Sequence, residues 1–336
     1  MLYITTRNTE QMHTAHLALT NDTGAEGGRY VPFRLMRLSS EELASLKQKP
    51  FNQIVAEILN LFFSSRLSAW DVDFCIGKNP VRIISMNHRI ILSEFWHNPD
   101  ARFSYMISRL SARLCGDQTA HTPTDWTVIA IRIAVMFGLY GQICSQELVS
   151  SGVEFDIVVP SDDFVAPMAA LYARQMGLPV NTVICSCDGD SELWELIHRG
   201  SFNTSAACDS LLLGLERLIL TTLGGEEVSR FCQCCARKRV YSVTEEQLQT
   251  LSAGLFCAVA GKNRAEATVN SLFRTNHYIV DPVTALCFSG LQDYRSGTGT
   301  SRVTLLMAER TPMDFMKEIS AATGIQEQKL IEHVKL

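Results

Sequence analysis

The sequence predicts an α/β fold, and three observations support this prediction. The 336 residues are 46% hydrophobic and 19% charged, a globular composition that argues against a disordered chain and allows one large domain or two. From about residue 81 onwards, short runs rich in β-branched residues alternate with helical patterns. Residues 153–180, VEFDIVVPSDDFVAPMAALYARQMGLPV, read as a strand, a turn, a helix, a second turn and the next strand, which is the repeating unit of a parallel sheet.

The first third of the chain alternates helical patterns with turns. Ser39 or Ser40 can cap a helix through Glu42, and Pro50 marks the break before a second helix. One face of that second helix is apolar and is formed by Ile54, Ile58, Leu61 and Phe62. These helices are expected to pack against the rest of the protein and to carry no chemistry.

Five apolar runs are the expected strands of the sheet: VRIIS, RIILSEF, FDIVVP, NTVICS and RVTLLMA. The helix over residues 164–176 lies between the third and the fourth run, and Gly177 with Pro179 stops it. Ser161 to Asp163 are good N-caps for this helix, and the two carboxylates suit the positive end of the helix dipole. Because open α/β sheets bind ligands beyond the carboxyl ends of their strands, a site is expected at this turn.

The charge pattern argues against a nucleic-acid or membrane-surface partner. A formal net charge of −5 leaves no face-sized excess of Lys and Arg to attract a polyanion. No apolar run is expected to span a membrane, and the N-terminus MLYITTRNTEQ lacks the charged-then-apolar order of a signal peptide. We therefore expect a cytoplasmic protein whose partners are small molecules or other proteins.

The cysteines are scattered through apolar segments such as LFCAVA, which suits buried, reduced thiols and predicts no structural disulfide. The one cluster, RFCQCCARKR, contains Cys232, Cys234 and Cys235. Zinc sites use four ligands, usually as two separated pairs, and neither a second pair nor a His at ligand spacing follows. We expect inert thiols near a helix end with a solvated basic tail, and no metal. The same spacing argument excludes the scattered histidines His88, His97 and His121 as metal ligands.

Several segments occur in the order in which they occur in one enzyme family. MLYITTRN is similar to M-x-Y-x-S-T-R-G, TGAEGGRYVPF to A-P-D-G-G-L-Y-V-P, and PTDWTVIAIRI to a helix that begins N-S-I-N-W. A D-P-x-T-A element follows and is formed by Asp281, Pro282, Thr284 and Ala285. In this ordered set the chain resembles the threonine synthases, which are fold type II pyridoxal phosphate (PLP) enzymes that convert O-phosphohomoserine to threonine.

The resemblance implies a threonine synthase-like N-terminal domain over residues 1–78. Over residues 79–336 it implies the three-layer α/β core of the tryptophan synthase β-like class. Between the helix ending near Cys115 and TPTDW the family carries a mobile small domain, on the order of a hundred residues, whereas this chain has only GDQTAH. Apolar positions from Ile129 to Tyr140 are then expected to need a new cover, either from that loop or from a second chain.

The reactive residue of the family is missing from the aligned position. The segment FWHNPDARFSY aligns with F-H-G-P-T-x-A-F-K-D, in which the lysine forms a Schiff base with PLP. This alignment puts Ser104 at the lysine position, while Asn98 and Asp100 replace the Gly and the Thr. A serine hydroxyl can neither hold the PLP aldehyde as an imine nor act as an amine base, so no catalytic residue is expected.

The positions for the cofactor's phosphate and pyridine ring are altered as well. Where the family has the Gly-rich loop G-N-F-G-N, this chain has Ser161, Asp162, Asp163 and Phe164. At an effective dielectric of about 20, each carboxylate would repel a phosphate at close range by roughly several kcal/mol. Glu309 takes the position that faces the pyridine nitrogen, and we expect it to be a polar residue at a strand end. No bound cofactor is expected, although the family by itself implies PLP.

The leading interpretation is a catalytically inactive threonine synthase homologue with a binding or regulatory role, which pairs with a second copy or with an intact threonine synthase. One alternative is a genuine threonine synthase. The other is an enzyme of different chemistry that reuses the old cleft through His97, Asp100, Asp162, Asp163 and Glu309. The positions of the vestigial pocket are Asn98, Ser161, Asp162, Asp163, Phe164 and Glu309.

Overall fold

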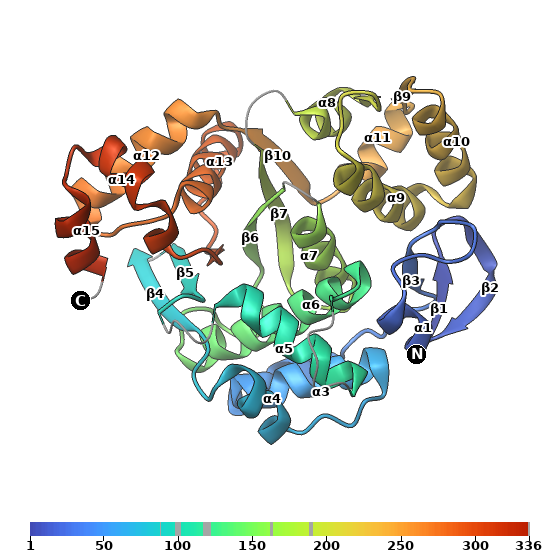
Figure 1. Cartoon of the computed structure of the whole chain (residues 1–336), viewed down its shortest axis with the longest axis horizontal. Coiled ribbons are helices and arrows are strands. Elements are labelled where there is room, and N and C mark those ends of the chain that lie inside the picture. The colour runs from blue at the N-terminus through green and yellow to red at the C-terminus, as the bar shows by residue number, and fades with distance from the viewer. Residues whose placement is uncertain (88, 98–101, 117–121, 162–163, 188–190, 335–336) are drawn as a thin grey trace.

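The computed structural model describes residues 1–87, 89–97, 102–116, 122–161, 164–187 and 191–334. Its centre is a six-stranded sheet with the order β10-β7-β6-β11-β5-β4 (Figure 1). The strands are β4 (Arg82–Asn87), β5 (Ile90–Glu94), β6 (Phe155–Pro160), β7 (Val180–Cys187), β10 (Leu255–Val259) and β11 (Thr304–Ala308). All neighbours are parallel except β4, which pairs antiparallel with β5 at one edge. The predicted α/β class is confirmed, and so are the five predicted strands, whereas β10 was not predicted.

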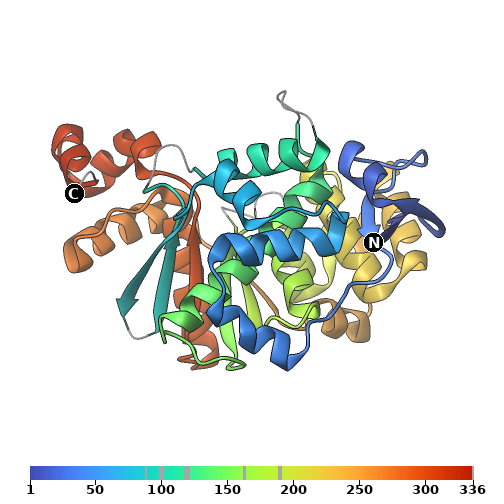
Figure 2. The same ribbon diagram turned by 90° about the horizontal axis from the view of Figure 1, so that it is seen from below.

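Helices cover both faces of this sheet, which gives three layers. One face packs on α3 (Phe51–Phe63), α5 (Phe103–Cys115), α6 (Asp125–Ser145) and α7 (Val165–Gln175), and the other on α12 (Lys262–Asn276), α13 (Pro282–Thr298) and α14 (Met316–Thr323). In β6, Ile157 and Val159 join the first core while Val158 joins the second, because successive strand residues point to opposite faces. Figure 2 shows the orange and red helices across the sheet from the blue and green ones.

The N-terminal segment combines helices with a small sheet that was not predicted. Its elements are β1 (Leu2–Thr5), β2 (Asn8–Thr14), α1 (Ala15–Thr20), β3 (Tyr30–Pro32), α2 (Ser40–Ser45), η1 (Leu46–Gln48), α3 and α4 (Ala69–Ile76), and its strands pair in the order β2-β1-β3. Ser39 and Glu42 form the predicted capping box at the start of α2. Helix α3 begins directly after Pro50, as the sequence also predicted.

A helical lobe follows β7, at the upper right of Figure 1. It contains α8 (Glu192–Arg199), β8 (Ser201–Asn203), α9 (Asp209–Leu223), α10 (Gly225–Ala236), β9 (Val240–Ser242) and α11 (Glu245–Leu251). The chain ends in η3 (Pro312–Phe315), α14 and α15 (Glu327–Val334). Residues 116–124 alone connect α5 to α6, which agrees with the deletion that the resemblance implied.

The expected need for a second chain to cover Ile129 to Tyr140 is wrong. These residues lie in α6, and every apolar side chain among them is buried within the single chain, in the same core as apolar residues of α3 and α7. Helix α6 is also long and apolar enough to cross a membrane by length and composition, contrary to the sequence-based expectation. However, 83% of its most apolar window is buried inside the fold, as in the core helix of a globular protein.

Close packing of α6 against α3 depends on Gly138, so this position should be sensitive to any larger side chain. A Cβ atom at Gly138 would lie 2.7 Å from two ring atoms of Phe51, so we expect Gly138→Ala to lower the free energy of unfolding by about 1–3 kcal/mol through overpacking. Chemical unfolding measures the change. Gly297→Ala in α13 is the control, because nothing lies within 4 Å of its new Cβ and the substitution should be neutral or slightly stabilising. Equal effects at the two glycines would contradict this account.

Candidate functional site

The candidate site lies at the carboxyl ends of β5, β6 and β11, which meet at one edge because these strands are parallel. A cavity of about 120 Å³ is found there, and its lining includes Arg132, Pro160, Ala166, Asp281, Glu309 and Arg310. Small-molecule sites usually measure about 300–1,000 Å³. The sequence predicted a site at this edge of the sheet, and the space that the described residues leave there is small.

An ion pair between Arg132 of α6 and Glu309, the first residue after β11, occupies this edge. Nη1 of Arg132 pairs with Oε1 of Glu309, and Nη2 donates to Oε2 at 2.9 Å. The two side chains are only 12% and 13% exposed, and the guanidinium carbon lies 4.7 Å from the ring centroid of Phe103. Glu309 is thus the polar residue at a strand end that the sequence predicted, with both carboxylate oxygens bound to one arginine.

Ser104 lies in the first turn of α5 and is exposed. Its carbonyl oxygen accepts a hydrogen bond from the Ser108 hydroxyl at 3.0 Å, an ordinary contact of a helical serine. No lysine is found among the described residues that line the cavity. An amine that could form an imine is therefore missing both from the aligned position and from this lining.

The turn after β6 differs from the expected one. The Ser161 hydroxyl donates to the carbonyl oxygen of Ser186 at 2.9 Å and lies 2.9 Å from Sγ of Cys187, so the prediction that Ser161 caps the next helix is wrong. Phe164 is the N-cap of α7 and adopts the left-handed conformation, with φ of 58° and no side-chain cap. A buried aromatic residue in this conformation is strained, since glycine is the usual occupant.

Four of the predicted site positions, Asn98, Asp100, Asp162 and Asp163, lie outside the described residues. Of the five residues that the alternative hypothesis of an enzyme with different chemistry uses as acid, base or metal groups, the structure therefore describes His97 and Glu309. Nε2 of His97 lies 3.1 Å from the carbonyl oxygen of Asn79, and His97 is not part of the cavity lining. The described residues do not bring these two groups together as an acid and base pair, and no cluster of metal-ligating side chains is found among them.

Sequence reasoning assigned no role at this edge to three polar residues, Glu94, Arg132 and Asp281. Glu94, the last residue of β5, is fully buried, accepts a hydrogen bond from Nε of Arg82 at 2.5 Å and also binds the Tyr278 hydroxyl. Asp281 is the N-cap of α13, where it accepts from two backbone amides, and burial raises the pKa of its carboxyl group. Arg132 had a sequence signal, because a lone arginine inside an apolar helix must find a buried partner.

The cysteine cluster lies on α10, and the basic residues that follow it are exposed, as predicted. Burial raises the pKa of the Cys232 thiol to about 11 and that of Cys235 to about 12. These thiols are therefore protonated near neutral pH, whereas a nucleophile or metal ligand must be a thiolate. No disulfide links cysteines among the residues that the structure describes.

The three-layer core and the position of the cavity define the fold of the fold type II PLP enzymes. The chain superposes with a TM-score of 0.83 on the PLP-bound threonine synthase from Brucella melitensis, at 15% identity, with all of this chain and 94% of that chain covered. For the threonine synthase from yeast the TM-score is 0.80 at 13% identity, with 98% and 91% covered. Likeness at this level of identity establishes the fold.

The sequence comparisons go one step further. Residues 2–79 match the family model described as threonine synthase N terminus. Threonine synthase-like 1 from Homo sapiens and from Pongo abelii are each 22% identical over 174 residues, which is 48% of this chain and 23% of those proteins. The match thus spans about a quarter of the curated relatives' length. Together with the shared fold, these findings show that the chain is similar to the threonine synthases and that residues 2–79 match the N-terminal model of that family.

Proposed function

We propose that this threonine synthase-like protein is a pseudoenzyme, which neither holds PLP nor makes threonine and acts instead by binding or regulation. The observation that carries the proposal is the ion pair between Arg132 and Glu309, which occupies the edge of the sheet where the cofactor ring would lie. The ion pair also uses both oxygens of the one carboxylate aligned with the pyridine position.

The residues aligned with the Schiff-base lysine and with the phosphate loop support the same proposal. PLP catalysis needs an amine that holds the aldehyde, exchanges with the substrate amine and moves protons, and the hydroxyl of Ser104 can do none of these near neutral pH. A phosphate would need several convergent backbone N–H groups at the start of α7. The Ser161 side chain is bound to β7 instead, and the Phe164 and Ala166 side chains occupy space that glycines would leave open.

The decisive measurement is phosphate release from O-phosphohomoserine with added PLP. We expect none from the wild type above a control without protein, and none from Ser104→Lys, because a new amine restores one covalent contact and leaves the other defects in place. A PLP-bound threonine synthase assayed in parallel shows that the conditions support turnover. Release by the wild type that is lost in Glu309→Gln would overturn the proposal and favour a genuine threonine synthase.

Two further properties belong to the proposal. We infer that the protein acts in the cytoplasm and that its partner is a protein, either a second copy or an intact threonine synthase, rather than a nucleic acid or a membrane. The charge of −5 supports the exclusion of polyanionic partners. Stoichiometric metal in the purified protein would instead favour an enzyme of different chemistry.

A further inference from the structure

Helix α4 carries the two most exposed large apolar side chains among the described residues. Trp70 is 71% exposed and Phe74 is 76% exposed, and their rings are stacked at a centroid distance of 5.8 Å. On the neighbouring helix α5, Tyr105 is 45% exposed. Figure 1 shows α4 at the lower edge of the molecule, next to α5. We call Trp70, Phe74 and Tyr105 the aromatic surface; exposed aromatic groups of this kind are typical of binding sites.

The aromatic surface is held in a fixed position by its supporting contacts. Asp71 and Ser68 form a capping box at the start of α4, and Oδ1 of Asp71 also accepts from Nη2 of Arg113 in α5 at 2.6 Å. Sγ of Cys75 contacts the carbonyl oxygen of Arg109 at 3.7 Å, so the two helices are tied at two levels. A surface that is rigid before binding loses little entropy when a partner docks.

Positive charges outnumber negative ones on and next to α4 and α5, although the whole chain is negative at −5. Four cations on or next to α4 and α5 are exposed, namely Arg66, Lys78, Arg109 and Arg113, and the same helices contain two acids, Asp71 and Asp73. The guanidinium of Arg109 also lies 5.9 Å from the ring centroid of Tyr105. This local excess of positive charge favours a partner with negative charge. A second copy that docked through the same surface would bring like charges together.

The size of the aromatic surface also argues against a second copy. With about 150–250 Å² for each aromatic side chain, the exposed parts of the three rings add up to roughly 300–500 Å². A standard interface between folded proteins buries about 800 Å² on each partner. The surface is therefore too small for a stable dimer and of the size that one face of a short helix covers.

We propose that the aromatic surface of α4 and α5 binds a short, acidic, amphipathic helical segment of a partner protein. The apolar side chains of the segment pack on the stacked rings of Trp70 and Phe74. Its carboxylates pair with exposed cations next to α4, namely Arg66 and Lys78. The proposal does not depend on whether the chain is catalytically active, since none of these residues lines the cavity at the carboxyl edge of the sheet.

The test uses two labelled synthetic peptides of about 15 residues, roughly four helical turns. Both have leucines at positions i, i+3, i+4 and i+7, and the remaining positions are rich in Glu in one peptide and in Lys in the other. Fluorescence anisotropy should show binding of the Glu peptide to the full chain and no comparable binding of the Lys peptide. Affinity for the Glu peptide should fall as salt is added, because exposed charges are screened.

Variants locate the binding surface. The double variant Trp70→Ala, Phe74→Ala should lower the affinity for the Glu peptide by at least about tenfold, the effect of removing aromatic hot spots. Phe33→Ala is the control: it removes an exposed aromatic side chain outside α4 and α5 and should leave the affinity unchanged. Circular dichroism and unfolding should match the wild type, since both rings are exposed. Equal binding of the two peptides, or no loss in the double variant, would overturn the proposal. Self-association that the double variant abolishes, measured by sedimentation, would overturn it in favour of a second copy.

Discussion

Glu309→Ala is expected to destabilise the protein by about 3 kcal/mol, because it leaves the guanidinium of Arg132 nearly buried without its carboxylate. The wild-type pair is held by two contacts and stacked on Phe103, so the arginine cannot turn to water without disturbing the core. Chemical unfolding monitored by circular dichroism measures the loss. A large loss would mean that the ion pair stabilises the carboxyl edge of the sheet.

Two controls separate the buried pair from a general effect of charge. Glu195→Ala removes the carboxylate of the exposed ion pair with Arg199 and should change stability by about 0.5 kcal/mol or less. Arg132→Met combined with Glu309→Leu should recover much of the loss, since replacing both members of a buried pair with apolar groups is often neutral. An effect of Glu309→Ala as small as that of Glu195→Ala would show that the pair contributes little.

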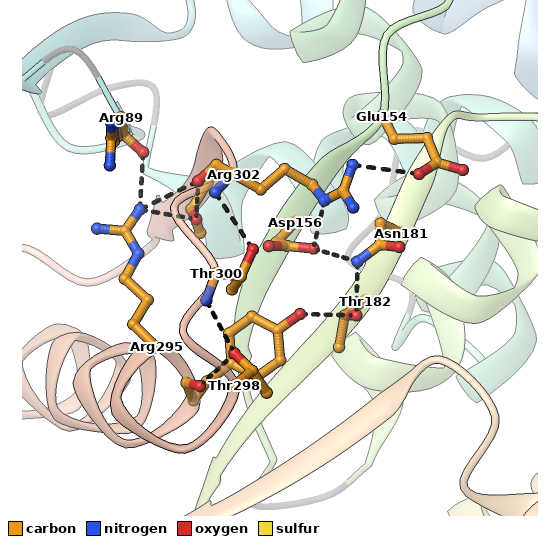
Figure 3. A network of polar contacts seen from close by, with 11 residues as sticks. Arg89, Glu154, Asp156, Asn181, Thr182, Arg295, Thr298, Thr300 and Arg302 are labelled. Carbon is orange, nitrogen blue, oxygen red and sulfur yellow. Dashed lines mark hydrogen bonds and ion pairs between the residues drawn. The ribbon is translucent and has the colours of Figure 1, made fainter.

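Arg302 lies at the opposite, amino-terminal edge of the sheet. Arg302→Ala is expected to lower the free energy of unfolding by about 2 kcal/mol at neutral pH. Figure 3 shows Asp156 of β6 between Arg302 and Asn181. Nε of Arg302 lies 3.8 Å from Oδ1 of Asp156, and Asn181 donates to the same oxygen at 2.9 Å. Asp156 is fully buried, so it depends on the positive charge nearby. Because Arg302 is 36% exposed and not in close contact, the expected loss lies below the roughly 3–5 kcal/mol for breaking a fully buried pair.

The pH dependence of this loss provides a second test. Burial raises the pKa of Asp156 in the folded protein above its ordinary value, so the folded state binds this proton more tightly than the unfolded state does. The contribution of Asp156 to stability is therefore most favourable below the unfolded pKa, and it is lost as the pH rises through the folded pKa. Arg302→Ala raises the folded pKa further, so the difference from the wild type should be largest at neutral pH and shrink in acid. A difference that grows in acid would contradict this assignment.

Glu154→Gln is the matched control for Arg302→Ala. Glu154 binds the same arginine, with its Oε2 3.2 Å from Nη1 of Arg302, but its side chain is largely exposed. Loss of that contact should change stability by about 0.5 kcal/mol or less, because water solvates both charges. If Glu154→Gln cost as much as Arg302→Ala, the contribution would come from the surface contact and not from buried Asp156.

Local sequence signals determined much of the fold. The capping box of Ser39 and Glu42 and the break at Pro50 depend on residues a few positions apart, and both were predicted. The five predicted strands are apolar runs whose β-branched residues favour a buried sheet. The missing amine at Ser104 is a matter of residue type alone, so no structure was needed to see that the side chain cannot form an imine.

Tertiary structure decided what no local pattern contains. Arg132 and Glu309 are 177 positions apart, and their pairing depends on α6 crossing the carboxyl end of β11. Ser161 was a good cap by residue type, yet its hydroxyl binds β7 because that strand lies alongside. Helix α6 was expected to be uncovered, but α3 packs over it, and the same apolar pattern would suit a helix in either place. Trp70 and Phe74 are of residue types that are usually buried, and only the packing of α4 shows that both side chains are exposed to solvent. Contacts between distant segments depend on how the elements are arranged in space, and local propensity does not specify that arrangement.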